Sequence, residues 1–118
     1  MNRGLNKVMI IGYLGKDPEI RYTPGGRAVT TFSVAVNRSY VGTDGEKKFE
    51  TDWFNVIAWG SLAEICAQYL AKGEHVYLDG RLQTRRWEDS EGIQHNSVEI
   101  VANEMLILGY RDLDNTET

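Results

Sequence analysis

The stretch SLAEICAQYLAKG, residues 61–73, contains the clearest helix signal in the sequence. Its apolar residues recur at i, i+3, i+4, i+7 and i+8, the spacing of one helix face. They are Leu62, Ile65, Cys66, Tyr69 and Leu70. Ser61, with Glu64 three positions later, predicts an N-terminal capping box, and Gly73 predicts a left-handed residue after the last turn. We therefore predict one helix whose apolar stripe, Cys66 and Tyr69 included, packs into a core.

Segments with strand character lie on both sides of this helix. Residues 7–14, 28–37 and 49–59 precede it, and residues 75–87 and 96–109 follow it. The polar loop at 41–48 predicts a hairpin with a long tip, and Gly12 and Gly80 predict bends or bulges within strands. Strands with one helix after the third are typical of the OB-fold, an all-β, five-stranded Greek-key barrel with a helix between strands 3 and 4. A β-sandwich is the alternative, but it leaves the single helix without an explanation.

The length fits one domain with one core. We expect residues 1–109 to form this domain and residues 110–118 to be an acidic, flexible tail. No run approaches the roughly 20 apolar residues of a membrane span, and the polar start MNRGLNKV is unlike a secretory signal. The single cysteine excludes an internal disulfide and a cysteine-rich zinc site. We expect a cytoplasmic protein without membrane partners, although a processed organellar protein would share these features.

The charge is divided unevenly along the chain. Residues 1–87 carry a net charge of +3 and residues 88–118 a net charge of −7, which gives −4 in total. A basic body with an acidic end is found among nucleic-acid binders, and acidic residues that merely solvate one end give the same numbers. The charge distribution alone does not separate these two interpretations.

Signatures of catalysis are absent from the sequence. It contains no phosphate-binding loop of the G-x-x-x-x-G-K type and no G-x-S-x-G elbow. His75, His95 and Cys66 lack the spacing of metal ligands, and no carboxylate stands alone in an apolar run, where its pKa would be raised. We predict a protein that is not an enzyme, with no catalytic residue, no metal and no cofactor.

Two predicted strands each carry an unusual polar-aromatic face. Alternation places Trp53, Asn55 and Trp59 on one face of the first strand. On the second strand, one face carries Arg81, Gln83, Arg85 and Trp87. Aromatic rings stack on unpaired bases, guanidinium groups pair with phosphates, and amides contact base edges or sugars. Together these two faces favour binding to single-stranded nucleic acid.

The alternative is that the tryptophans are structural. Tryptophans on strands usually fill a core or a subunit interface, and for Trp59 alone that interpretation is favoured. Trp87 differs, because its burial would also bury the arginines beside it. The only predicted helix is not basic, which argues against reading of duplex DNA in the major groove.

The sequence also resembles a known family, the bacterial-type single-stranded DNA-binding proteins, over about residues 1–109. The segments that carry the resemblance are NRGLNKVMIIGYLGKDPEIRYTPGG, TDWFNVIAWG, LAEICAQYLAKGEHVYLDGRLQTRRWED and VANEM. The pattern N-K-V followed by G-x-L-G-x-D-P-E-x-R-Y is specific to that family. The second specific pattern is Y-L-x-K-G followed by G-R-L-x-T-R-x-W.

The resemblance implies an OB-fold that assembles into a homotetramer around which single-stranded DNA wraps, in DNA replication, recombination and repair. It implies a nucleoid-associated location within the cytoplasm. The implied stacking residues are Trp53, Trp59, Trp87 and, as a smaller ring, Tyr40. The implied contacts to the DNA backbone are Arg3, Lys7, Lys48, Lys72, Arg81, Arg85 and Arg86. Asn55 is a candidate polar contact.

The sequence departs from the family at its C-terminus. Many bacterial members end in an acidic tip that finishes in Ile-Pro-Phe and recruits replication and repair proteins, whereas this sequence ends in DLDNTET. Partners that bind through that tip are therefore in doubt. The second hypothesis for the chain is an accessory OB domain, similar to those of primosomes, whose aromatic faces bind another protein. A gel shift on single strands distinguishes the two.

Overall fold

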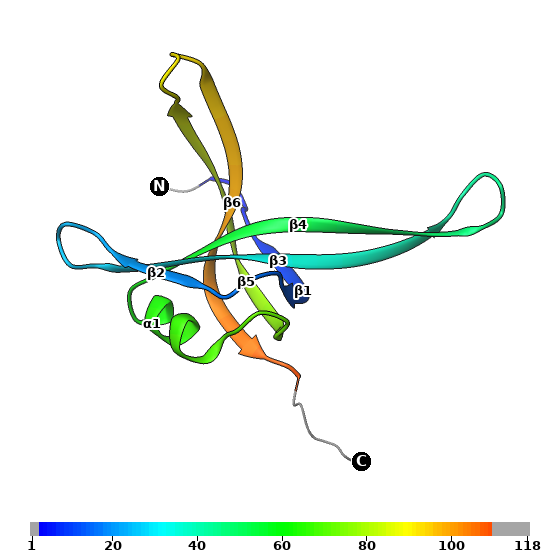
Figure 1. Ribbon diagram of the computed structural model, residues 1–118, viewed down its shortest axis with the longest axis horizontal. Coiled ribbons are helices and arrows are strands. Elements are labelled where there is room, and N and C mark those ends of the chain that lie inside the picture. Colours follow the sequence, from blue (N-terminus) through cyan, green and yellow to red (C-terminus); the bar gives the residue numbers. More distant parts are fainter. Residues whose placement is uncertain (1–2, 110–118) are drawn as a thin grey trace.

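The computed structural model describes residues 3–109, and the predicted acidic tail at 110–118 lies outside the described residues. The chain forms a strand-rich structure with one helix (Figure 1). Its elements are β1 (Val8–Leu14), β2 (Glu19–Tyr22), β3 (Ala28–Val41), β4 (Lys47–Trp59), α1 (Gly60–Tyr69), β5 (His75–Glu88) and β6 (Gln94–Ile107). The predicted strand order is confirmed, with the short β2 as an additional strand along β3.

Five strands close into a barrel. The hydrogen-bonded order runs β1-β5-β6-β4-β3, and β3 returns to β1 at Tyr13 and Leu14. All neighbours are antiparallel except β4 and β6, which pair in parallel at 55–57 and 99–101. The helix α1 connects β4 to β5, the third and fourth strands of the barrel. The predicted OB-fold is therefore confirmed, and the β-sandwich is not.

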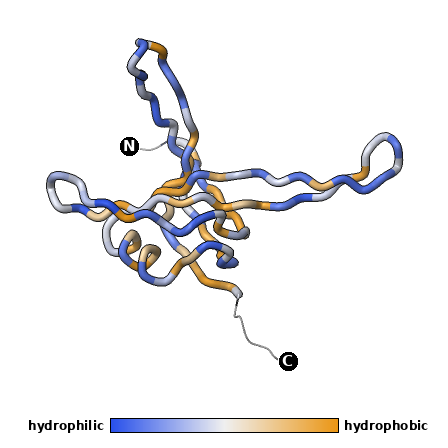
Figure 2. Tube along the Cα trace, in the orientation of Figure 1, coloured by the Kyte–Doolittle hydropathy of each residue, from blue (hydrophilic) through white to orange (hydrophobic). Residues whose placement is uncertain are grey.

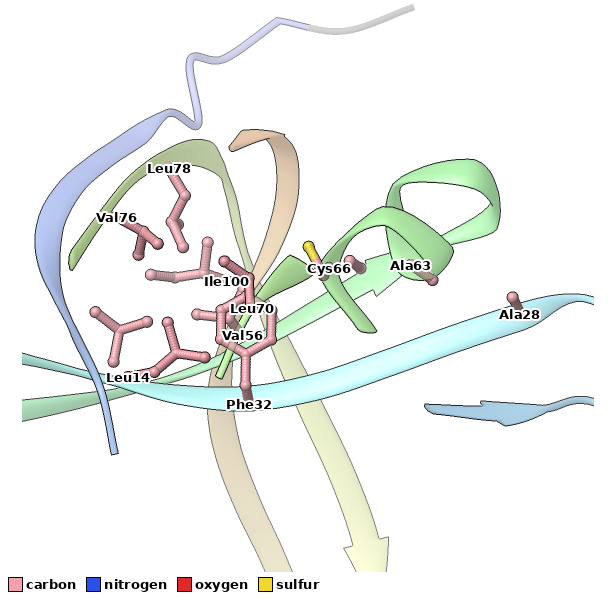
Figure 3. Close-up of a cluster of buried hydrophobic side chains, with 12 residues drawn as sticks. Leu14, Ala28, Phe32, Val56, Ala63, Cys66, Leu70, Val76, Leu78 and Ile100 are labelled. Carbon is pink, nitrogen blue, oxygen red and sulfur yellow. The ribbon is translucent and has the colours of Figure 1, made fainter. Parts of the chain in front are cut away.

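The barrel core is apolar, and α1 packs against one part of it. Val34, Val56, Val76, Leu78 and Ile100 are almost completely buried, and Figure 3 shows their cluster continuing to the helix. The helix contributes Ala63 and Cys66, and Leu70 follows directly after it. The buried Thr30 hydroxyl of β3 donates a hydrogen bond to the Ala63 carbonyl at 2.7 Å, which fixes the helix to the sheet.

Two details of the predicted helix are wrong. It begins at Gly60 with Trp59 as N-cap, and no side chain caps it, so the predicted box of Ser61 and Glu64 does not form. Gly60 has a φ of +66°, which lets the chain turn directly from β4 into the helix without a side-chain cap. The buried stripe is also rotated, because Ala63 faces the core while Tyr69 is 58% exposed.

The β1 pairing is regular through Gly12, whereas the register of β5 with β6 shifts at the step from Asp79 to Gly80, which is where the irregularity at Gly80 was predicted. A Cβ at Gly12 would lie 2.3 Å from the Ala35 carbonyl oxygen, and one at Gly80 would lie 2.0 Å from that of Val101. Both glycines therefore allow backbones to approach closely, Gly12 where β1 meets β3 and closes the barrel and Gly80 where β5 meets β6. The extra residue at this shift belongs to β6, where Asn103 has no partner between Glu104 and Ala102.

Three hairpins extend beyond the barrel as arms (Figure 1). Each is closed by a three-residue loop: residues 24–26, 43–45 and 90–92. The third loop residue is a glycine with positive φ in every case, namely Gly26, Gly45 and Gly92. This is the geometry of a type I turn followed by a left-handed residue. The predicted long tip at 41–48 is therefore wrong, because β3 and β4 stay paired as far as Val41 and Lys47. Figure 2 shows that hydrophobic residues gather in the barrel and that the arms are mostly hydrophilic.

Candidate nucleic-acid interface

The hairpin of β3 and β4 has two chemically different faces. Its register is uninterrupted from the pair Val29–Trp59 to the pair Val41–Lys47, so directly paired residues share a face along its whole length. The face that carries Val34, Val56 and Ala58 packs into the core, and we call it the inner face. We call the opposite face, formed by the odd-numbered residues 29–41 and 47–59, the outer face.

The outer face carries no carboxylate. It consists of Val29, Thr31, Ser33, Ala35, Asn37, Ser39 and Val41 of β3 with Lys47, Phe49, Thr51, Trp53, Asn55, Ile57 and Trp59 of β4. The inner face, by contrast, carries Glu50 and Asp52 on the arm. Near the barrel, the neighbouring strands add Glu19 beside Thr31 and Glu99 beside Asn55 on this side of the sheet. The arm at 35–41 and 47–53 is therefore the part of this face that is suited to a polyanion, because phosphates meet no carboxylate there.

Trp53 lies in the middle of the outer face and is 59% exposed. The edge of its ring lies against Gly15, where a Cβ would come within 2.4 Å of a ring carbon. The absence of a side chain at Gly15 therefore leaves room for the indole. Because more than half of Trp53 is in contact with solvent, its ring is available for stacking.

Trp59 ends the outer face next to α1 and is half-buried. The guanidinium carbon of Arg27 lies 4.6 Å from the centroid of its ring, which is cation–π geometry. Trp59 is therefore not a core residue of this chain. A base that stacks on the Arg27 side of the ring would have to displace that guanidinium or stack on it.

The arm of β5 and β6 presents a second polar-aromatic face. By register, Gln83, Arg85 and Trp87 share a face with Glu99, Ser97 and His95. The rings of Trp87 and His95 stack with centroids 4.4 Å apart, and Trp87 remains 44% exposed. One face of this indole is therefore covered by His95, and a base would stack on the other. Arg86 pairs with Asn96 and lies on the opposite face of the arm.

The two polar-aromatic faces meet in a groove of about 320 Å³. Asn55 of β4 and Arg85 of β5 both line it. Arg85 also makes a long ion pair with Glu99, at 3.8 Å between Nη1 and Oε2. Sequence reasoning missed two further cations of this groove, Lys16 and Arg21. Arg21 is a specified position of the motif G-x-L-G-x-D-P-E-x-R-Y, which is the signal that could have identified it, whereas Lys16 falls on a variable position of that motif.

Other predicted backbone contacts lie elsewhere. Lys7 and Arg81 line a second groove of about 310 Å³. Beside it, Asn6 binds both backbone groups of Leu82, at 2.7 and 2.9 Å, and so anchors the start of the chain. Arg3 is exposed near this segment of the chain. Of the predicted cations, Arg85 therefore lines the first groove, and Lys7 and Arg81 line the second.

Two predicted lysines belong to neither groove. The Lys48 ammonium lies 3.2 Å from Asp44 in the same arm, so an acidic neighbour already compensates its charge. Lys72 is exposed in the turn after α1, and its backbone N–H donates a hydrogen bond to Asp17 at 2.9 Å.

Tyr40 lies on the inner face of the arm, opposite to the side of Trp53. Arg38 is 5.9 Å from its ring centroid and bonds to Asp52 at 3.0 Å and to Glu50. The hydrogen bond and charge of Asp52 raise the pKa of Arg38 above its ordinary value. Tyr40 is 43% exposed, but it has two carboxylates on its own face.

No group of His, Cys, Asp and Glu within residues 3–109 is arranged to hold a metal ion. In the same part of the chain, no helix is long and apolar enough to cross a membrane. Cys66 is buried, and this burial raises the pKa of its thiol to about 11, so the thiol stays protonated and unreactive.

Comparison with known proteins gives a consistent result. Residues 5–108 match the sequence profile described as "Single-strand binding protein family". The chain is 48% identical over 113 residues to "Single-stranded DNA-binding protein 1" of Chlorobaculum tepidum, covering 95% of this chain and 70% of that protein. It is 48% identical over 108 residues to "Single-stranded DNA-binding protein" of Neisseria meningitidis serogroup A, covering 92% and 62%. The chain thus spans about two thirds of the length of these relatives.

A solved structure described as "Plasmodium falciparum SSB complex with ssDNA" superposes on the chain with a TM-score of 0.86. The two are 33% identical, and the match covers 92% of this chain and all of the other.

Proposed function

This chain belongs to the single-strand binding protein family, a family of DNA-binding proteins, and we propose which of its surfaces bind single-stranded DNA. They are the outer face of the hairpin of β3 and β4, and the face of the β5–β6 arm that carries Arg85 and Trp87. One observation carries the proposal. Two exposed tryptophans lie on the outer face and on the face of the neighbouring arm, and Asn55 and Arg85 of these two faces line one groove. The groove also contains the cations Lys16 and Arg21 and the carboxylates Asp17, Glu19 and Glu99. A core or interface role alone would not require cations and amides on the same faces as the rings.

The proposed mechanism is stacking supported by phosphate pairing. Bases stack on Trp53, Trp59 and Trp87, and each stacked base contributes about 1–3 kcal/mol, the general value for OB-folds that bind single strands. The contribution does not depend on sequence, since every base presents a π-face to a ring. Tyr40 is proposed as a weaker stacking residue, because the carboxylates on its face repel phosphates.

Cations beside these rings hold the DNA backbone. We propose Arg85, together with Lys16 and Arg21, as the contacts in the first groove. The further proposed contacts are Arg3, Lys7, Lys48, Lys72, Arg81 and Arg86. Asn55 is proposed to contact a base edge or a sugar. Because phosphate pairing releases counterions, the affinity should fall as the salt concentration rises.

Tryptophan emission tests the proposal directly. The chain has three tryptophans, and all are proposed to stack. Addition of oligo-dT should therefore quench emission strongly, while a duplex of equal length should not. Equal quenching by both, or none by oligo-dT in moderate salt, would overturn the proposal and favour the protein-interaction interpretation.

Homotetramers are typical of this family. In the single chain, β1 exposes Met9, Ile11 and Tyr13, which are apolar groups that a second subunit can cover. We propose that the assembled protein coats single strands during replication, recombination and repair, at the nucleoid. Light-scattering mass with and without a long oligonucleotide reports assembly and stoichiometry together.

A further inference from the structure

The arm of β3 and β4 exposes an aromatic ring that neither sequence motif includes. Phe49 is 74% exposed, the most exposed aromatic side chain among residues 3–109. Register places it opposite Ser39 on the outer face, the face of Trp53. Because most of this ring is in contact with solvent, it contributes little to the stability of the single chain. A ligand that covers the ring would bury this apolar surface.

The charge around Phe49 indicates what kind of ligand it meets. The ammonium group of Lys47 lies 5.7 Å from the ring centroid and makes no salt bridge within the described residues. On the opposite face, by contrast, Arg38 is paired with Glu50 and Asp52, and Lys48 is paired with Asp44. The arm therefore keeps its unpaired cation and its carboxylate-free surface on the same side as the ring.

The spacing along β4 is also suitable for a continuous strand of DNA. Phe49 and Trp53 are four residues apart on one strand face, which is about 13 Å. Stacked bases of one strand are only about 3.4 Å apart in a duplex, so the two rings would meet different bases. Thr51 lies between them, and its hydroxyl donates a hydrogen bond to Asn37 at 2.7 Å, within the same face.

We propose that Phe49 is a further stacking residue for single-stranded DNA, which extends the path from Trp53 outward along the arm of β3 and β4. This inference rests on the proposed function, since it concerns the same ligand. It assigns the outer face of the arm, rather than the face of Tyr40, as the main route of the strand.

Variants of the ring test the proposal. Phe49→Leu keeps an apolar side chain but removes the π-face, and it should weaken binding to long oligo-dT by about fivefold or more. Tyr40→Leu is the matched control on the inner face and should lose less. Phe49→Trp should retain affinity and add emission that oligo-dT quenches. Unchanged affinity in Phe49→Leu, or unquenched added emission in Phe49→Trp, would overturn the assignment.

Charge provides an independent measurement on the same face. Ser39→Glu places a carboxylate directly opposite Phe49, and Ser39→Gln is its neutral match in size. The Glu variant should bind oligo-dT more weakly than the Gln variant, with the difference decreasing at high salt. Equal affinities of the two would contradict a DNA path along this face.

Two controls distinguish a stacking role of Phe49 from a role in assembly and from a failure of DNA binding as a whole. If Phe49→Leu reduces the light-scattering mass of the protein, the ring is a subunit contact and the inference is wrong. Wild-type protein and Trp53→Ala are measured in the same series. Failure of the wild type to bind would refute the proposed function, whereas binding that depends on Trp53 and not on Phe49 would refute only the inference.

Discussion

Replacement of Trp53 by alanine should damage binding far more than folding. The side chain is 59% exposed, so roughly 100 Å² of its surface is buried, out of about 250 Å² for a tryptophan. At about 25 cal/mol per Å² that burial contributes at most about 2.5 kcal/mol, and less against a realistic unfolded chain. We expect the free energy of unfolding to fall by about 1–2 kcal/mol. Loss of one stacked base should weaken binding by roughly 5-fold to 150-fold.

The matched control is Phe32→Ala in the same sheet. Phe32 is only 7% exposed, and its truncation should decrease the free energy of unfolding by about 3–5 kcal/mol. Unfolding is followed by circular dichroism at one fixed protein concentration, because assembly makes stability depend on concentration. Binding is followed by the anisotropy of a labelled oligo-dT at fixed salt, which does not depend on tryptophan emission.

One combination of results would refute the reasoning. If Trp53→Ala unfolds as readily as Phe32→Ala, and its folded fraction binds oligo-dT like the wild type, Trp53 is a structural residue. The exposed outer face would then have no stacking role at its centre.

Three further outcomes test the barrel, the core and one arm. Gly12→Ala should lower the Tm by roughly 10 °C or more, because the added Cβ meets the Ala35 carbonyl oxygen at 2.3 Å; an unchanged melting curve would contradict the barrel closure. Cys66 should react with a thiol reagent at about pH 8 only after denaturation, since its pKa is raised to about 11; rapid reaction of folded protein would disprove its burial. The hydrogen bond from His95 lowers the pKa of Asp89 in the folded protein below the ordinary value. The stability that Asp89 adds to its turn is therefore complete above about pH 4, and it is lost as the pH falls through the lowered pKa of the folded state. The midpoint of the titration of the Asp89 carboxyl carbon, followed by NMR, should therefore lie below about pH 4, and a midpoint above that pH would contradict the hydrogen bond from His95.

The order of elements could be predicted because local signals agree with the barrel. Alternation identified the strands, and the apolar spacing of residues 61–73 identified the helix. The start of the helix was wrong because Gly60 adopts a positive φ, a backbone solution that removes the need for the Ser61 cap. The exposure of Tyr69 was missed because helical spacing fixes a stripe only to within about one residue, and Ala63 is small enough to pack closely instead.

The sequence also predicted which side chains share a strand face at the site, but it did not predict which strands meet there. Alternation placed Trp53, Asn55 and Trp59 on one face correctly. The groove that brings Asn55 to Arg85 depends on the parallel contact of β4 with β6, which is distant in sequence. Phe49 begins the predicted strand at 49–59, but it was missed because it stands outside the pattern of Trp53, Asn55 and Trp59, and the exposure of its ring depends on how far β3 and β4 extend as an arm.

The three short glycine-closed loops have a practical consequence for anyone who modifies this molecule. Each loop makes its own turn with local hydrogen bonds, and the loops at 43–45 and 90–92 lie at the ends of long arms, away from the barrel. A dye or an affinity handle attached at residue 43 or 44 would therefore leave the packing of the interior untouched. For the same reason, an arm can be lengthened or shortened by adding or removing two residues in each of its strands, which keeps every side chain on its original face. Such a change alters how far the arm extends along a bound polymer and leaves the barrel unchanged.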